Sequence, residues 1–285
     1  MAPHWPVVAT VMLLLAGCSP APLPAPTAGP TAVSSATPSP TSPSPSPIIT
    51  PTPAAPMGLV YFVVDTTRGF RLVRESRREA ADARGAVEGM IAGPHDPDYL
   101  SSWPKDTRVL GIEQRAGVIS VNLSGEARGA NVGASGEAIM VQQLVWTVTG
   151  AVDPTAPVLA TIEGEPASWG HLSWDEPLTR QDALDVRLLV GIDSPGEAES
   201  VTSPVRLSGE ANVFEATLPW RVMRPDGTVI QEGFVTTTEG QAFAPWELTL
   251  TLPPGSYVFE VHDSDPSGGE STRPPDRDSR TFTVA

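Results

Sequence analysis

The 285-residue sequence predicts a multidomain fold in which an α+β domain precedes an all-β sandwich, both following a disordered linker. Three observations predict it. Residues 19–56 are rich in Pro, Ser and Thr and carry no charge. Residues 57–181 alternate strand patterns with two helix patterns, whereas residues 185–285 contain short strand patterns only. Residues 1–18 form a separate apolar leader.

This leader ends in the single cysteine of the sequence. An apolar run from Val7 to Leu15 leads into Leu15-Ala16-Gly17-Cys18. The run is too short to span a bilayer and is typical of a secretory signal, although residues 1–6 lack the usual Lys or Arg. The last four residues resemble a bacterial lipobox, which implies that Cys18 is acylated and becomes the new N-terminus. We therefore expect Cys18 to be a lipid-attachment residue; the alternative is a buried structural cysteine.

The linker between residues 19 and 56 alternates Pro with Ser, Thr or Ala. Such a segment cannot bury enough apolar surface to offset its ordering entropy. We expect a disordered stalk with a polyproline-II bias, able to reach about 100 Å when extended. A Pro-rich recognition ligand is the alternative, but no Arg or Lys lies beside the prolines.

Charge is confined to the rest of the chain. The formal net charge of −15 belongs entirely to residues 57–285. This acidity disfavours nucleic acid or an anionic membrane surface as a partner. All basic residues except Lys105 are Arg, which we interpret as codon bias.

The α+β domain is predicted from five strand patterns and two helix patterns. Gly93-Pro94 ends the first helix, and Ser135 is the expected N-cap of the second. The order ββαββαβ implies two helices packed on one sheet. The strands are expected at 59–64, 70–74, 108–112, 118–123 and 158–162. The first helix is expected at 80–91, and the second runs from its cap at Ser135 as far as Gly150, with its apolar face at 138–148.

Several motifs of this segment resemble those of GerMN domains, the sporulation and spore-germination domains. The motifs occur in the same order as in that family, and together they cover nearly all of residues 57–181. The resemblance implies a non-catalytic envelope domain that serves in assembly or protein interaction. The matching segments are 60–62, 90–94, 109–112, 118–123, 143–149, 162–166 and 176–180.

The all-β domain is predicted from short strands separated by turns. Residues 225–227 and 253–255 are strong turn signals, and Trp246, Leu248, Leu250 and Leu252 mark one buried face. Seven or eight strands favour an antiparallel sandwich of immunoglobulin type without the disulfide. The strands are expected at 186–192, 205–208, 212–217, 220–224, 228–236, 246–252, 257–262 and 281–284.

This half also resembles a known family, the immunoglobulin-like domain of bacterial spore germination, which often follows GerMN domains. One departure from the family pattern is a long polar insertion at residues 264–279. The matching segments are 203–205, 207–211, 213–216, 220–222, 233–235, 244–246 and 252–261.

The sequence patterns predict no catalytic residue, no cofactor and no metal site. Ser135 does not lie in a nucleophile elbow, and its role as a helix cap explains it. His95, His171 and His262 are isolated and lack zinc-site spacing. The best cation candidate is the acidic loop around Asp263, Asp265 and Glu270, but its spacing misses the EF-hand pattern. We expect a solvated acidic loop there.

Together these observations predict a lipid-anchored lipoprotein on the extracytoplasmic face of the bacterial cell membrane. It would act as a non-catalytic binding or assembly module, with envelope proteins or cell-wall components as partners. One alternative is an accessory lipoprotein of an envelope signalling system. Another is a solute-binding protein or envelope enzyme with a site at the domain junction. Clustered Asp, Glu and His at the junction would favour the last alternative, and a shallow apolar patch would favour a protein-interaction surface.

Overall fold

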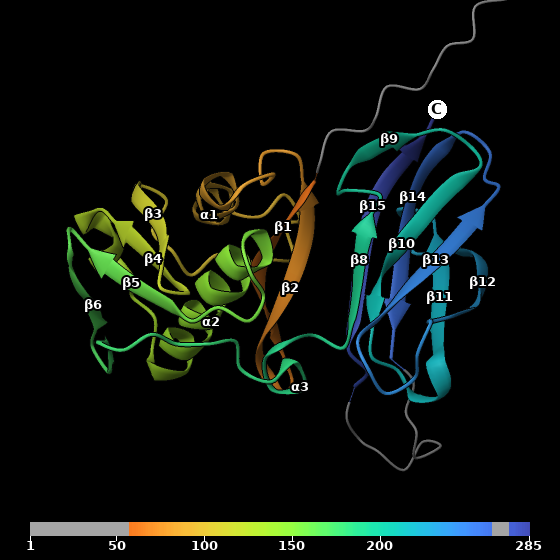
Figure 1. Cartoon of the computed structure of the whole chain (residues 1–285). Helices are drawn as coiled ribbons and strands as arrows, with labels where there is room; N and C mark the ends of the chain where they lie inside the picture. Colours follow the sequence, from red (N-terminus) through yellow and green to blue (C-terminus); the bar gives the residue numbers. More distant parts are fainter. Residues whose placement is uncertain (1–56, 264–273) are drawn as a thin grey trace, which may run out of the picture. The chain divides into compact units, whose positions relative to one another are not determined.

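The computed structural model describes residues 57–263 and 274–285. The predictions for Cys18, the linker, Asp265 and Glu270 therefore lie outside the described residues. No helix in the described part is long and apolar enough to cross a membrane. The described chain has the predicted α+β part followed by the predicted all-β part (Figure 1).

The α+β domain begins with the predicted hairpin, β1 (Gly58–Thr66) and β2 (Gly69–Arg77). The predicted helices follow as α1 (Ala83–Ala92) and α2 (Ala134–Ala151). A five-stranded sheet has the order β3-β4-β5-β6-β7. Its strands are β3 (Val109–Arg115), β4 (Val118–Leu123), β5 (Val158–Ile162), β6 (Glu165–Trp169) and β7 (Leu172–Trp174).

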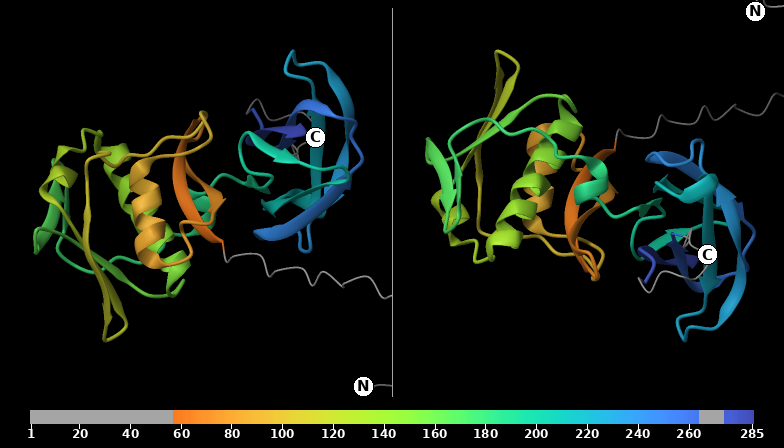
Figure 2. Two further views of the ribbon diagram at one scale, coloured as in Figure 1. Left: turned by 90° about the horizontal axis from the view of Figure 1, so that it is seen from above. Right: turned by 90° about the horizontal axis from the view of Figure 1, so that it is seen from below.

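The two helices lie between this sheet and the β1–β2 hairpin, as Figures 1 and 2 show. The prediction of two helices on one sheet is therefore wrong, because β1 and β2 form a separate two-stranded sheet. The outer edges of the hairpin pair elsewhere: Val63 of β1 bridges to Leu100, and Leu72 of β2 bridges to Arg187.

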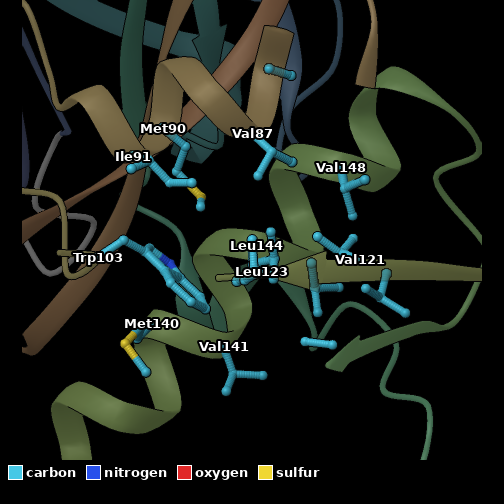
Figure 3. Close-up of a cluster of buried hydrophobic side chains, with 14 of the residues drawn as sticks. Val87, Met90, Ile91, Trp103, Val121, Leu123, Met140, Val141, Leu144 and Val148 are labelled. Carbon is cyan, nitrogen blue, oxygen red and sulfur yellow. The ribbon is translucent and has the colours of Figure 1, made fainter. Parts of the chain in front are cut away.

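Helix α2 is buried on two sides as a result. Met140, Leu144 and Val148 belong to the main core with the β4 residues Val121 and Leu123 (Figure 3). Ile139 and Trp146 pack instead with the hairpin. An 18-residue helix with apolar residues all round is expected where both faces meet a sheet, so the single buried face predicted for α2 is incomplete.

The predicted N-cap at Ser135 is also wrong. The cap of α2 is Gly133, whose carbonyl accepts the Glu137 N–H at 2.9 Å, and Ser135 lies in the first turn. The chain enters the helix two residues earlier because the extended backbone of Gly133 already provides the cap geometry. In α1, the Asp82 carboxylate is the cap and accepts the Gly85 N–H at 2.8 Å.

The β6–β7 hairpin was not predicted. Its two tryptophans are buried and each finds a backbone acceptor: Trp169 Nε1 donates to Ala127 O at 2.9 Å, and Trp174 Nε1 donates to Val158 O at 3.1 Å. Because both indole N–H groups are hydrogen-bonded, these large aromatic side chains can be buried at the end of the sheet.

The all-β domain is a sandwich of two sheets with the orders β13-β10-β8 and β12-β11-β14-β15-β9. Neighbouring strands are antiparallel except β15 and β9. A short helix, α3 (Ala183–Val186), precedes it. Its strands are β8 (Val190–Ser194), β9 (Glu199–Val201), β10 (Val205–Ala211), β11 (Thr217–Met223), β12 (Val229–Thr236), β13 (Ala244–Leu250), β14 (Gly255–His262) and β15 (Arg277–Val284).

The predicted strand at 212–217 does not form as such. Strand β10 already ends at Ala211, and Phe214–Ala216 is a 3₁₀ turn, η2. Glu215 and Ala216 have positive φ angles of 53° and 56°, which a strand cannot accommodate.

A glycine sets the packing within the three-stranded sheet. A Cβ atom at Gly209 would lie 2.0 Å from the Gly191 carbonyl oxygen and 2.8 Å from the Trp246 ring. Trp246 is buried and packs 6.1 Å from Phe259, measured between ring centroids. Position 209 therefore has no room for a side chain.

We predict that Gly209→Ala lowers the free energy of unfolding by about 2 kcal/mol, because overpacking displaces the Gly191 backbone and the Trp246 ring. Urea unfolding measures the change. Gly111→Ala is the control, since a Cβ atom there has no neighbour within 4 Å. Equal effects of the two substitutions would contradict the packing described.

Candidate functional site at the domain junction

Arginine–carboxylate pairs join the α+β domain to the sandwich. Arg74 of β2 donates from Nε and Nη2 to the Asp193 carboxylate, at 2.8 and 2.6 Å. Its Nη1 donates to Glu210 of β10 at 2.5 Å. Arg187, which follows α3, donates to the same Glu210 oxygen at 2.6 Å. The fork of Arg74 matches the carboxylate plane, so this contact fixes orientation as well as distance.

The electrostatics of Glu210 reflect this arrangement. Burial acts to raise the pKa of Glu210, but the charges of Arg187 and Arg74 outweigh it and hold the pKa below its usual value. Glu210 is therefore ionised at neutral pH. The Arg187 guanidinium also stacks 4.1 Å from the Phe243 ring centroid and 5.4 Å from that of Trp146, which adds cation–π contacts from both domains.

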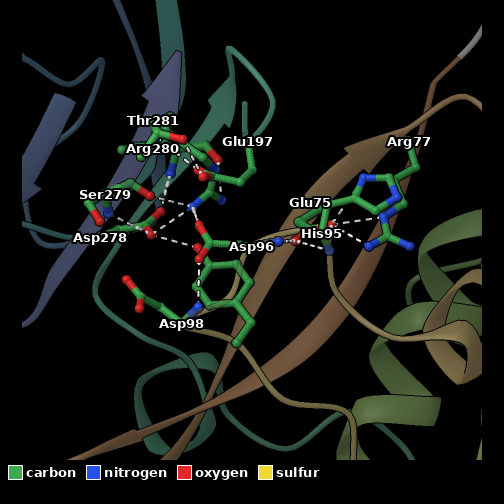
Figure 4. A network of polar contacts seen from close by, with 12 residues as sticks. Glu75, Arg77, His95, Asp96, Asp98, Glu197, Asp278, Ser279, Arg280 and Thr281 are labelled. Carbon is green, nitrogen blue, oxygen red and sulfur yellow. Dashed lines mark hydrogen bonds and ion pairs between the residues drawn. The ribbon is translucent and has the colours of Figure 1, made fainter. Parts of the chain in front are cut away.

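A second cluster surrounds Arg280 of β15 (Figure 4). Its Nη1 donates to Asp96 of the first domain at 2.6 Å and to Asp278 at 3.0 Å. The Tyr99 hydroxyl donates to Asp278 at 2.6 Å. The side chains of Arg280, Asp96 and Asp278 are each 2% exposed. An ion pair buried this deeply is stable only while all of its partners remain in place.

Glu75 positions the loop that carries Asp96. Its carboxylate accepts the backbone N–H groups of His95 and Asp96, at 3.1 and 3.0 Å, and Arg77 Nε donates to it at 2.8 Å. Strand β2 thereby orders the segment after α1 and places Asp96 against Arg280, as Figure 4 shows.

Further contacts extend the junction. Arg68 pairs with Asp276, and the Leu189 N–H donates to the same carboxylate at 3.1 Å. The Leu188 N–H donates to Leu72 O of β2 at 2.9 Å. The junction therefore combines charged pairs with backbone hydrogen bonds.

An open pocket of 460 Å³ lies beside these ion pairs. Its walls carry charge, but most of the charged groups already have partners: Arg77 binds Glu75, Asp193 binds Arg74, and Glu197 accepts the Thr281 N–H at 2.9 Å. No group of His, Cys, Asp and Glu among the described residues could hold a metal ion. The lining residues are Met57, Ser76, Arg77, Arg78, Glu79, His95, Asp193, Ser194, Gly196, Glu197, Glu199 and Ser208.

A second hollow, of 380 Å³, has no charged lining residue. It lies beside the start of α2, and its apolar walls include Leu100, which is exposed. This apolar groove has the character expected of a protein-interaction surface. It is lined by Val63, Phe70, Leu100, Ser101, Ser102, Asn131, Val132, Gly133, Ser135, Gly136 and Ile139.

The candidate residues from the sequence do not converge. His95 lies beside Glu75, whereas His171 lies 3.4 Å from Glu137 at the β6–β7 turn. His262 ends β14 and contacts the Asp263 carbonyl. Ser135 is exposed at the apolar groove. No sequence pattern indicated the junction arginines. The excess of Arg over Lys, interpreted above as codon bias, also provides a bidentate geometry that Lys cannot.

The architecture defines a two-domain class, an α/β domain with helices between two sheets followed by an immunoglobulin-like sandwich. Residues 59–168 match the family described as sporulation and spore germination, and residues 189–270 match the immunoglobulin-like domain of bacterial spore germination. The chain therefore carries a sporulation and spore-germination domain followed by this immunoglobulin-like domain, as its motifs predicted. No curated protein matches the sequence.

Solved structures give weaker likenesses. The tandem GerMN domains of the sporulation protein GerM from Bacillus subtilis are 17% identical, with a TM-score of 0.37, covering 44% of this chain and 44% of that one. The first GerMN domain of the same protein is 21% identical, with a TM-score of 0.35, covering 44% and 98%. CopC from Methylosinus trichosporium OB3b is 21% identical, with a TM-score of 0.25, covering 33% and 92%. The family assignment rests on the two family models.

We predict that Arg280→Met lowers the free energy of unfolding by about 3–5 kcal/mol, because Asp96 and Asp278 remain buried without their counter-charge. Urea unfolding at pH 7 tests it. Arg115→Met is the matched control, since its pair with Glu113 is largely exposed and should contribute within about 0.5 kcal/mol. A loss at Arg280 no larger than that at Arg115 would contradict the buried junction.

The junction also predicts a pH dependence. Burial raises the pKa of Asp96 from 3.8 to about 6, although the Arg280 charge opposes it. Because the folded pKa exceeds the unfolded one, the stability contributed by protonated Asp96 is complete below pH 3.8 and is lost as pH rises through 6. The wild type should therefore lose stability relative to Asp96→Asn between pH 4 and pH 7. Unfolding of both chains in urea across this range measures the difference, and a constant difference would exclude the shift.

Proposed function

We propose that this chain is a lipid-anchored envelope protein whose two domains act together as one non-catalytic binding or assembly module. The observation that carries the proposal is the ion-pair junction between the GerMN and immunoglobulin-like domains. Its partners would be envelope proteins or cell-wall components.

Buried ion pairs support a docked arrangement in particular. Desolvating a charge costs several kcal/mol, so a pair contributes little net stability against an apolar contact of equal size. Separation of the domains, however, would take Asp96 away from Arg280 and Glu210 away from Arg74. Such pairs favour a single docking geometry over alternatives, which suits a module that presents surfaces of two domains together.

The same contacts argue against catalysis at the junction. Clustered carboxylates do lie there, as the enzyme alternative requires, but those of Asp96, Asp193 and Glu210 are bound to arginines in the described part of the chain. A general acid or base must be free to exchange its proton with a substrate. The carboxylates therefore have a structural role.

The open pocket beside the junction supports one second candidate, a solute-binding protein. Arg78, Glu79 and His95 line this pocket and give it side chains of both charges. A small zwitterionic solute is the class of ligand that such walls would fit.

Anchoring through Cys18 is testable directly. In the native bacterium, Cys18→Ser should move the protein out of the membrane fraction or block its processing, because no acyl chain can be attached. Membrane fractionation followed by immunoblotting measures the shift. Ser19→Ala keeps the cysteine and should leave the protein membrane-bound. Detergent-dependent retention of the Cys18→Ser chain, equal to that of the wild type, would show that the anchor is misassigned.

A further inference from the structure

Strand β12 (Val229–Thr236) forms one edge of the five-stranded sheet of the sandwich. It pairs with β11 on one side, and no strand of the described residues pairs with its other side. All of its residues are exposed except Val235, which is half-buried. An eight-residue edge of this kind offers a row of unpaired backbone groups.

Three other edges in the described part of the chain are protected. The outer edge of β1 pairs with Leu100, and β9 has only three residues. Strand β13 contains Pro245, which lacks an N–H group. Strand β12 contains neither Pro nor Lys, the residues that usually block an edge. It is therefore suited to accept an additional strand.

The register indicates which backbone groups are free. Pro219 of β11 lies opposite Phe234 and has no N–H to donate. The ladder bonds to β11 are then made at the alternate pairs, which include Trp220 with Gly233. The N–H and C=O groups of Phe234 and Glu232 consequently point to the open edge.

The side chains of the same residues form an exposed row. Phe234 is 71% exposed and Ile230 is 39% exposed, and Glu232 lies between them. Glu232 lies opposite Arg221, but Arg221 pairs with Glu260 of β14 at 2.8 Å. Glu232 has no ion pair within the described residues. The row therefore consists of an apolar, an acidic and an apolar side chain, in that order.

A second copy of this chain fits the edge poorly. Antiparallel self-pairing that matches Ile230 with Phe234 places Glu232 directly opposite Glu232, and like charges in that position are destabilising. Each copy also carries a net charge of −15. Charge complementarity favours a basic partner.

We infer that β12 binds an extended segment of a partner protein by strand addition. The segment carries a Lys or Arg opposite Glu232 and apolar residues opposite Ile230 and Phe234. Main-chain hydrogen bonds supply affinity in this mode, and the alternate side chains supply specificity. The inference rests on the proposed binding role and does not involve the lipid anchor.

The test uses two labelled peptides, Thr-Val-Thr-Lys-Thr-Val-Thr and its counterpart with Glu in place of Lys, and fluorescence anisotropy with the full-length chain. The Lys peptide should bind about fivefold more tightly than the Glu peptide, because one attractive pair replaces one repulsive pair. Glu232→Lys should reverse this preference. Phe234→Thr should weaken both peptides.

Glu113→Lys is the matched control, since it makes the same change of charge on the exposed edge strand β3 and should leave the preference unchanged. Equal binding of both peptides, or binding of neither, would overturn the inference. Concentration-dependent dimers in sedimentation that Phe234→Thr abolishes would also overturn it, since the occupant would then be a second copy. The fractionation of Cys18→Ser bears only on the anchor, so the two proposals fail separately.

Discussion

The rest of the structure depends on the ion pairs that arginines form at the domain junction. Arg74 and Arg187 converge on Glu210, while Arg280 reaches across to Asp96. These charges are buried where the domains meet, so any other docking geometry that kept them buried but unpaired would cost several kcal/mol. The junction thus couples the position of the GerMN domain to that of the immunoglobulin-like domain.

This coupling fixes the surfaces of the two domains relative to each other. The apolar groove beside α2 belongs to the GerMN domain, and the open edge of β12 belongs to the sandwich. If the domains were freely jointed, the two surfaces would bind their partners independently. Because the domains are coupled, binding at one surface holds the other surface in a defined orientation. The proposed lipid anchor at Cys18 would add placement at the membrane. The proposed assembly module requires all three: docked domains, surfaces in a defined orientation and placement at the membrane.

Local patterns in the sequence predicted most of the elements and few of the contacts. Alternating apolar residues and turn glycines predicted the β1–β2 and β3–β4 hairpins, because such signals act over a few residues. The separate position of the β1–β2 sheet depends on Leu100 and Arg187, which lie far along the chain. The junction escaped prediction for the same reason: Arg74 and Asp193 are 119 residues apart, and no periodicity relates them.

The central claim is that the two domains move as one body, and ¹⁵N relaxation of the backbone amides in the full-length chain tests it most directly. If the junction holds, amides of the GerMN domain and of the immunoglobulin-like domain report the same rotational correlation time at physiological salt. Two distinct correlation times, each close to that of a domain tumbling alone, would contradict the account.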